Sequence, residues 1–247
     1  MPRVSTTAIV WVLAVMLFAA LVQSVGGFGF ALLAVPLAAI AIDLQTVVIV
    51  VSLGSLFNVV ILSWRTRREI DRDLARRFNV PAVFGMPIGL AVLSVVDQRP
   101  LKIALGIVII VATVALMRGA ANLTPRAWVE MLAGFTSGIL STATGTNGPP
   151  LVLASQMRGL APASFRATLS FTFTVSGTIS MVMFVAAGLV TRDEVLLTLA
   201  GVPLILLGQR TGLRLQPLFS GRRFEMLVYV LLLVSGMSVG LSGLLAR

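Results

Sequence analysis

The chain has 247 residues, of which 57% are hydrophobic and only 11% are charged, and its mean hydropathy is +1.02. A soluble domain of this size needs a more strongly charged surface, so this balance excludes an ordinary soluble protein. The sequence has no cysteine and no histidine, which excludes thiolate or imidazole metal sites, disulfides, and catalysis by Ser/His or Cys/His pairs. We therefore expect no metal, no other cofactor and no enzymatic activity.

The net charge is +10, from 19 basic and 9 acidic residues. In a soluble protein this excess would suggest nucleic-acid binding, but the chain has neither a basic tail nor a cluster of stacking aromatic residues. In a membrane protein, basic residues concentrate in cytoplasmic loops. The composition therefore predicts a multi-pass helical membrane protein that contacts lipid and binds no nucleic acid.

The first apolar segment covers 4–25. It follows Arg3 as a signal peptide would, but it is long and has no clean cleavage site, so we expect it to be retained. It breaks at Gly26-Gly27-Phe28-Gly29 and resumes over 30–42, which is too short to cross a bilayer alone. A second broken segment covers 127–143, the break 144–150, and 151–157. The unbroken spans are expected at about 46–64, 79–96, 101–117, 164–189, 194–209 and 224–245.

One broken segment followed by three spans occurs twice, which predicts two homologous halves, 1–120 and 121–247, in one integral membrane domain. Trp11 corresponds to Trp128 at an offset of 117 residues, and Gly29 corresponds to Gly148 at an offset of 119. An offset that drifts so little is typical of an internal duplication.

Two topologies fit this order. If each broken segment crosses the membrane, the chain has eight crossings, with 11 basic residues in the cytoplasm and 8 outside. If each broken segment is a re-entrant hairpin that enters and leaves on one side, the second half is inverted, and the numbers become 14 and 5. Because basic residues collect on the cytoplasmic side, we favour the inverted repeat with both termini outside, and eight crossings remain the alternative.

Each glycine-rich break would place non-helical backbone inside the bilayer, where only protein or a water-filled cavity can satisfy it. Paired breaks in corresponding places of two halves indicate a transporter's binding site. The short helix after each break would point its N-terminus toward the middle of the membrane and attract an anion. The candidate substrate-binding residues at the breaks are Gly26, Gly27, Phe28, Gly29, Thr144, Gly145, Thr146, Asn147, Gly148 and Pro149.

The alternative for these glycines is that they only permit close helix packing. We expect that simpler role for two pairs elsewhere, Gly85 with Gly89 and Gly208 with Gly212.

Further polar candidates lie near the breaks. Asn58 shares one side of its helix with Ser52 and Ser55, and we include Asn58 among the substrate-binding residues. Gln23, Ser24 and Gln156 are placed similarly but are weaker candidates. Arg166 and Arg210 are expected to anchor the membrane edge, and the alternative is that they guide an anion toward the cavity.

Every one of the 9 acidic residues lies in a loop or near the end of an apolar segment. This placement disfavours an intramembrane aspartyl protease and a cation pump with a buried acidic relay. Glu130 is the most interior acid; we expect it to be a helix-start residue, with a part in proton coupling as the alternative.

The first break reads GGFGFALLAVP over 26–36, and the second reads GTNGPPLV over 145–152. With the chain length, the duplicated halves and the basic loop 65–77, these motifs resemble the paired signatures of the TauE/SafE sulfite exporter family. The resemblance implies a carrier of the bacterial inner membrane, linked to export of sulfite and organosulfonates. It marks Gly26, Gly27, Gly29, Pro36, Gly145, Gly148 and Pro149. The second signature departs from the family by Thr-Asn-Gly-Pro where more glycine is expected, so the resemblance does not choose the anion.

The sequence thus predicts a carrier that binds a small sulfur-containing anion between the two breaks and works by alternating access. Two alternatives stay open, an anion channel built on the same cavity and a membrane assembly subunit that transports nothing. The small-residue helix faces would also permit a homodimer.

Overall fold

The computed structural model describes residues 5–26, 29–118, 124, 126–215 and 222–245. Within these ranges the chain forms ten α-helices and one short 3-10 helix, η1, and no strand. The elements are α1 (Thr6–Gly26), α2 (Phe30–Ala38), α3 (Leu44–Thr66), η1 (Arg67–Glu69), α4 (Arg72–Val95), α5 (Gln98–Arg118), α6 (Ala127–Thr144), α7 (Gly148–Met157), α8 (Pro162–Ala186), α9 (Arg192–Leu215) and α10 (Arg222–Leu245).

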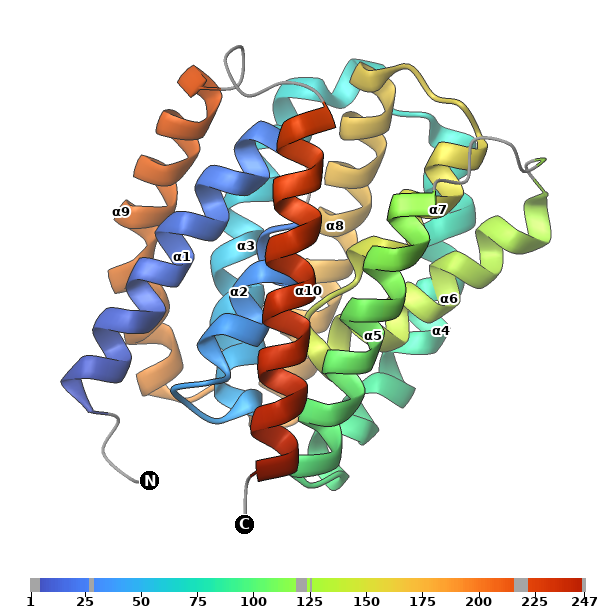
Figure 1. Ribbon diagram of the computed structural model, residues 1–247. Coiled ribbons are helices and arrows are strands. Elements are labelled where there is room, and N and C mark those ends of the chain that lie inside the picture. The colour runs from blue at the N-terminus through green and yellow to red at the C-terminus, as the bar shows by residue number, and fades with distance from the viewer. Residues whose placement is uncertain (1–4, 27–28, 119–123, 125, 216–221, 246–247) are drawn as a thin grey trace.

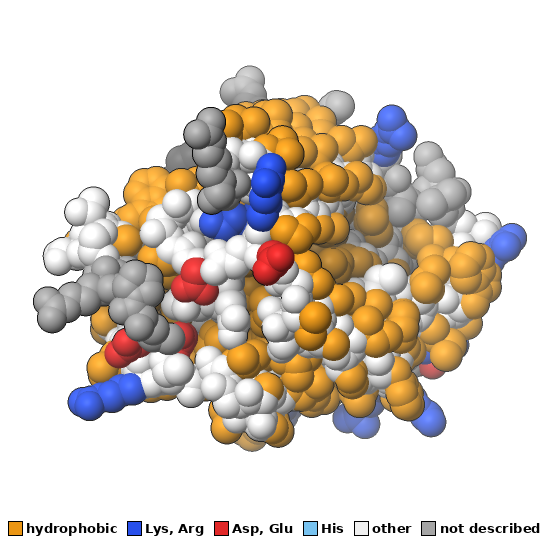
Figure 2. Space-filling model, turned by 90° about the horizontal axis from the view of Figure 1, so that it is seen from below, with side chains coloured by type: hydrophobic (Ala, Val, Ile, Leu, Met, Phe, Trp, Pro, Cys, Tyr) orange, Lys and Arg blue, Asp and Glu red, His pale blue; other side chains and the backbone are white. Residues whose placement is uncertain are grey.

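Seven of the described helices are long and apolar enough to cross a bilayer, namely α1, α3, α4, α5, α8, α9 and α10. Many of their large apolar side chains face outward, among them Trp64, Phe84 and Val111. Viewed from below, apolar side chains cover much of the visible surface and charged ones are few (Figure 2). A soluble protein would not expose this much apolar surface, so the prediction of an all-helical multi-pass membrane protein is confirmed.

The two broken segments form hairpins that open at opposite ends of the molecule. In Figure 1, α1 rises from the lower end and α2 returns to it, whereas α6 descends from the upper end and α7 returns to that end. Each hairpin is followed by three long helices, so α1 begins and α10 ends at the same, lower end. This is the course that the re-entrant topology predicts.

Helix contacts follow a pattern that exchanges the two halves. Helix α4 packs against α6 as α9 packs against α1, and α5 packs against α7 as α10 packs against α2. Helices α3 and α8 contact each other across the centre, as do α5 and α10. A duplicated chain would show this exchange, so the contacts support the internal repeat, which stays a prediction.

Glycines let the helices of the two halves approach closely. A Cβ atom at Gly85 or Gly89 of α4 would overlap the backbone of α6, and one at Gly208 or Gly212 of α9 would overlap the backbone of α1. The packing role expected for these four glycines is confirmed, because only a residue without a side chain fits there.

Helix α4 begins at Arg72, earlier than the span expected from about residue 79. The side chain of Asp71 accepts a hydrogen bond of 3.0 Å from the Leu74 backbone N–H and so caps the helix. The helix therefore begins with two charged turns, which include Arg72, Asp73, Arg76 and Arg77, before its apolar part. Hydropathy alone finds the apolar part of a helix, but it does not find the capped end.

Candidate functional site

The two breaks meet at one small cavity of about 50 Å³ in the interior of the bundle. The first break contributes Gly29 and the start of α2, and the second contributes 145–148. A buried water occupies roughly 10–15 Å³ by the same measure, so the cavity suits a solute of only a few heavy atoms. Its further lining residues include Gln23, Ser52, Ser55, Ser141, Phe173 and Ser180.

The first break delivers backbone donors to this cavity. Gly29 has a left-handed backbone with φ of 102°, which favours glycine, and it caps the N-terminus of α2. The first intrahelical bond of α2 runs from the Leu33 N–H to the Gly29 carbonyl at 3.1 Å. The N–H groups of Phe30, Ala31 and Leu32 therefore precede any helical acceptor, and all three residues line the cavity. This helix start is suited to an anion.

The second break is built from polar side chains. Gly145 ends α6 with φ of 67°, and Asn147 caps α7. The Asn147 side-chain amide donates to the Ser176 hydroxyl at 2.9 Å. The Asn147 backbone carbonyl accepts from the Ser137 hydroxyl at 2.9 Å. The hydroxyls of Thr144 and Thr146 lie 2.7 Å apart. Helices α6 and α8 thus hold the break in one conformation.

The second helix start offers fewer backbone donors than the first. Pro149 and Pro150 occupy the first turn of α7, and proline has no N–H. Among the residues that begin α7, Gly148 supplies a backbone N–H and lines the cavity. At α2 the helix start thus offers several free N–H groups, whereas at α7 polar side chains take a larger share.

Hydroxyl and amide groups complete the cavity wall. The hydroxyls of Ser141 and Ser180 lie 3.0 Å apart, and Ser55 donates to the Ser52 carbonyl at 2.9 Å. Behind the wall, the buried side chain of Asn58 donates to the Gln23 side-chain carbonyl. All of the described lining residues are uncharged. The arrangement can replace part of the hydration shell of a small anion through neutral donors and the dipole of α2.

The sequence of the chain is similar to those of known proteins. The sequence profile of a family described as Sulfite exporter TauE/SafE matches residues 12–239. The chain belongs to the TauE/SafE family. It is also 25% identical over 235 residues to the probable sulfite/organosulfonate exporter TauE of Cupriavidus necator, covering 91% of this chain and 90% of that one. No solved structure matches the chain.

Membership of the TauE/SafE family confirms the expected resemblance and makes the protein a bacterial multi-pass membrane exporter rather than an enzyme. The family description names sulfite, and the name of the relative gives sulfite or an organosulfonate, which are small anions. Neither comparison identifies the residues that bind the anion.

The structure places the predicted residues of this TauE/SafE chain unequally. Gly29, Gly145, Thr146, Asn147 and Gly148 line the cavity. Gly26 is the last residue of α1, and Gly27 and Phe28 lie outside the described residues. Thr144, Pro149 and Asn58 are buried beside the cavity without lining it. Arg166 of α8 and Arg210 of α9 are not among the lining residues, and their role stays a prediction.

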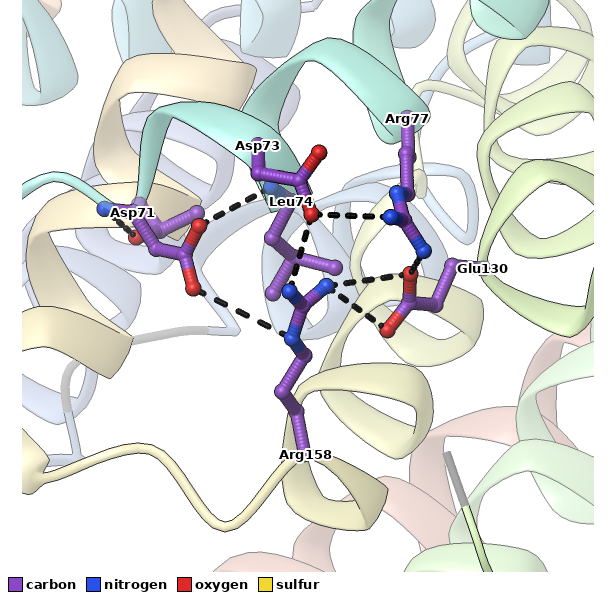
Figure 3. A network of polar contacts seen from close by, with 7 residues as sticks. Asp71, Asp73, Leu74, Arg77, Glu130 and Arg158 are labelled. Carbon is purple, nitrogen blue, oxygen red and sulfur yellow. Dashed lines mark hydrogen bonds and ion pairs between the residues drawn. The ribbon is translucent and has the colours of Figure 1, made fainter. Parts of the chain in front are cut away.

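Five charged residues at the upper end of the molecule form one network, which was not predicted from the sequence (Figure 3). The Glu130 carboxylate, on the first turn of α6, is only 3% exposed and accepts bonds from Arg77 and Arg158, each at 3.0 Å. Both arginines also contact Asp73, Arg77 at 3.0 Å and Arg158 at 2.9 Å, and Arg158 reaches Asp71 at 3.9 Å. The i,i+4 spacing of Asp73 and Arg77 was the one local signal of this cluster.

The network joins the two halves of the chain. Asp73 and Arg77 belong to the start of α4, whereas Glu130 and Arg158 belong to the hairpin formed by α6 and α7. The hydrogen bond to Asp73, aided by the charges of Glu130 and Asp71, raises the pKa of the Arg158 guanidinium. Arg158 therefore stays charged and ties the end of α7 to α4.

Proposed function

We propose that the protein exports a small sulfur oxyanion, with sulfite as the preferred substrate, by alternating access at the cavity between the two breaks. The observation that carries this proposal is the meeting of Gly29, Asn147 and the start of α2 around one uncharged cavity, which apolar and neutral polar side chains line together. Backbone N–H groups, hydroxyls and the Asn147 amide supply donors, and no lining carboxylate among the described residues repels an anion. Neutral donors also permit release, which a carrier requires.

The size of the cavity supports the choice of sulfite. A volume of about 50 Å³ suits one compact oxyanion, whereas a sulfonate with an organic chain needs more room. An alternating-access cycle further requires that the hairpins move relative to the long helices. The network of Arg77, Glu130 and Arg158 would then hold the α6–α7 hairpin against α4 in this conformation.

The proposal is tested by uptake of labelled sulfite, sulfoacetate, sulfate and chloride into proteoliposomes. We expect saturable sulfite uptake that falls at least tenfold in Asn147→Ala, because the loss of a charge-stabilising donor costs about 1.5–3 kcal/mol. Gly148→Leu should abolish uptake without unfolding the protein. A Cβ there lies 3.8 Å from the Phe173 ring, an ordinary contact, and the rest of the leucine would fill the cavity.

Thr178→Ala is the matched control, because Thr178 lies on α8 like Ser176 but is exposed and donates to its own helix at the Thr174 carbonyl. It should transport as wild type does. Sulfite uptake that persists in both cavity variants would contradict a site between the breaks. Flux that rises linearly with concentration would favour a channel, and no flux of any anion in folded protein would favour an assembly role.

A further inference from the structure

A wide groove of about 860 Å³ lies at the upper end of the molecule, between η1, α4 and α8, and is separate from the transport cavity. Four arginines line it, Arg67, Arg68, Arg72 and Arg76, and we call it the arginine groove. Its other lining residues include Asn79 of α4 and, from α8, Phe171 and Val175. The groove therefore has a cationic rim and an apolar wall.

The arginines of the groove carry no compensating ion pairs among the described residues. Arg67 lies over the Trp64 ring, 4.2 Å from its centroid, which leaves its charge in place. The nearby carboxylates of Asp71 and Asp73 are engaged by the Leu74 N–H, Arg77 and Arg158. The remaining neighbour, Glu69, is exposed and is not a lining residue. Four arginines that line one groove favour an anionic ligand.

The apolar wall indicates that this ligand also has a hydrocarbon part. Beyond Asn79, the outer side of α4 continues with Val83, which is 42% exposed, and α8 continues beyond Val175 with Val182, which is 64% exposed. Both helices cross the bilayer, so this apolar strip faces lipid tails. The groove lies at the end of the molecule that holds most basic residues, which is the cytoplasmic side.

Asn79, a lining residue of the groove, holds a hydrogen-bond acceptor without a partner. Its side-chain N–H donates to the Ala75 carbonyl at 2.8 Å, whereas its side-chain oxygen is buried and has no partner. A buried acceptor without a donor is costly, and a ligand hydroxyl would satisfy it. A ligand with phosphate oxygens for the arginines, a hydroxyl for Asn79 and hydrocarbon tails for α4 and α8 would match this groove. These groups occur together in a glycerophospholipid whose headgroup carries a hydroxyl.

We propose that the arginine groove binds the headgroup of phosphatidylglycerol, an anionic glycerophospholipid of the cytoplasmic leaflet, with its acyl chains along α4 and α8. The phosphate contacts Arg72 and Arg76, and a glycerol hydroxyl donates to the Asn79 side-chain oxygen. This site is independent of which anion the protein transports.

Native mass spectrometry of the purified full-length protein tests the proposal by titration with phosphatidylglycerol, phosphatidic acid and phosphatidylcholine. We expect phosphatidylglycerol to bind more tightly than phosphatidylcholine. The double variant Arg72→Ala/Arg76→Ala should weaken phosphatidylglycerol binding roughly 30-fold, from the typical contribution of two basic residues near an anionic lipid. The matched control Arg210→Ala/Arg214→Ala removes two exposed arginines of α9 at the same end and should change binding less than about threefold.

Equal weakening in both double variants would overturn the proposal, because it would indicate general charge attraction. Displacement of the lipid by millimolar inorganic phosphate would overturn it as well, since the groove would then be a site for a small anion. Asn79→Leu should weaken phosphatidylglycerol but not phosphatidic acid, which lacks the headgroup glycerol. Equal effects on both lipids would contradict the hydroxyl contact. Thermal unfolding of each variant checks that the protein remains folded.

Discussion

Glu130 shows how one residue can carry a buried charge in a membrane protein. Its carboxylate is 3% exposed, yet two guanidinium groups donate to it, and these groups are 34% and 24% exposed themselves. The arginine charges thus stay partly hydrated while the carboxylate is paired. Removing the carboxylate would leave Arg77 and Arg158 with Asp73 and Asp71 on the α4 side and with no acidic partner on α6.

The first residue-scale prediction concerns Glu130→Gln. The neutral amide loses the charge-assisted bonds from Arg77 and Arg158, which keep only Asp73 and Asp71 as partners, so we expect the free energy of unfolding to fall by about 1.5–3 kcal/mol. Thermal unfolding in detergent measures the change. The control is Glu69→Gln, which removes an exposed carboxylate on η1 and should stay within about 0.5 kcal/mol of wild type. If the two variants unfold alike, the network does not hold the hairpin to α4.

At the level of helices, α4 and α6 pack through glycines on both partners. Gly85 and Gly89 of α4 lie against the backbone of α6, and Gly134 and Gly138 of α6 lie against the backbone of α4 at Phe78 and Ala82. The contact joins the first half of the chain to the second hairpin. Because backbone packs against backbone on both sides, a side chain added to either helix cannot be accommodated by a change of rotamer in the other.

Gly138→Ala tests this contact. The added methyl group would overlap the Ala82 carbonyl, so we expect a loss of about 1–3 kcal/mol in stability from overpacking. The control is Gly240→Ala in α10, where a Cβ would lie 3.8 Å from the Gly106 Cα atom, an ordinary contact. Its unfolding temperature should equal that of wild type or exceed it slightly, because alanine favours the helix. A Gly138→Ala protein as stable as Gly240→Ala would contradict close backbone packing.

For the molecule as a whole, the directions of the two hairpins determine which charged residues lie at the same end of the bundle. With one hairpin opening below and the other above, the starts of α4, α6 and α8 and the ends of α3, α5, α7 and α9 all lie at the upper end (Figure 1). The basic 65–77 segment and Arg118, Arg126, Arg158, Arg166, Arg210 and Arg214 therefore gather there. The positive-inside rule therefore predicts that this end is cytoplasmic.

The absence of native cysteines allows this orientation to be tested with single introduced thiols. Asp193→Cys lies at the lower end, on the exposed start of α9, and Glu69→Cys lies at the upper end on η1. We expect a membrane-impermeant maleimide to label Asp193→Cys in intact spheroplasts, and to label Glu69→Cys only after permeabilisation. The opposite pattern would invert the molecule, and labelling of both sites in intact cells would contradict hairpins that open at opposite ends.

Local properties of the sequence were enough for the class of protein and for the position of the breaks. Apolar runs of bilayer length predicted the long helices, and glycines at 26–29 and 145–148 predicted the breaks, because hydropathy and backbone freedom act within a few residues. The same motifs were sufficient to indicate the TauE/SafE family, which the profile match confirmed.

The tertiary structure decided which polar groups meet. Gln23 with Asn58, Asn147 with Ser176, and Asp73 with Arg158 are separated by 35, 29 and 85 residues along the chain. Whether such a pair meets depends on the rotation and crossing of two helices, and many side chains besides the pair itself set that geometry. For this reason a cavity between the two breaks could be predicted from the sequence, whereas the charged network and the arginine groove became visible only once the helices were packed.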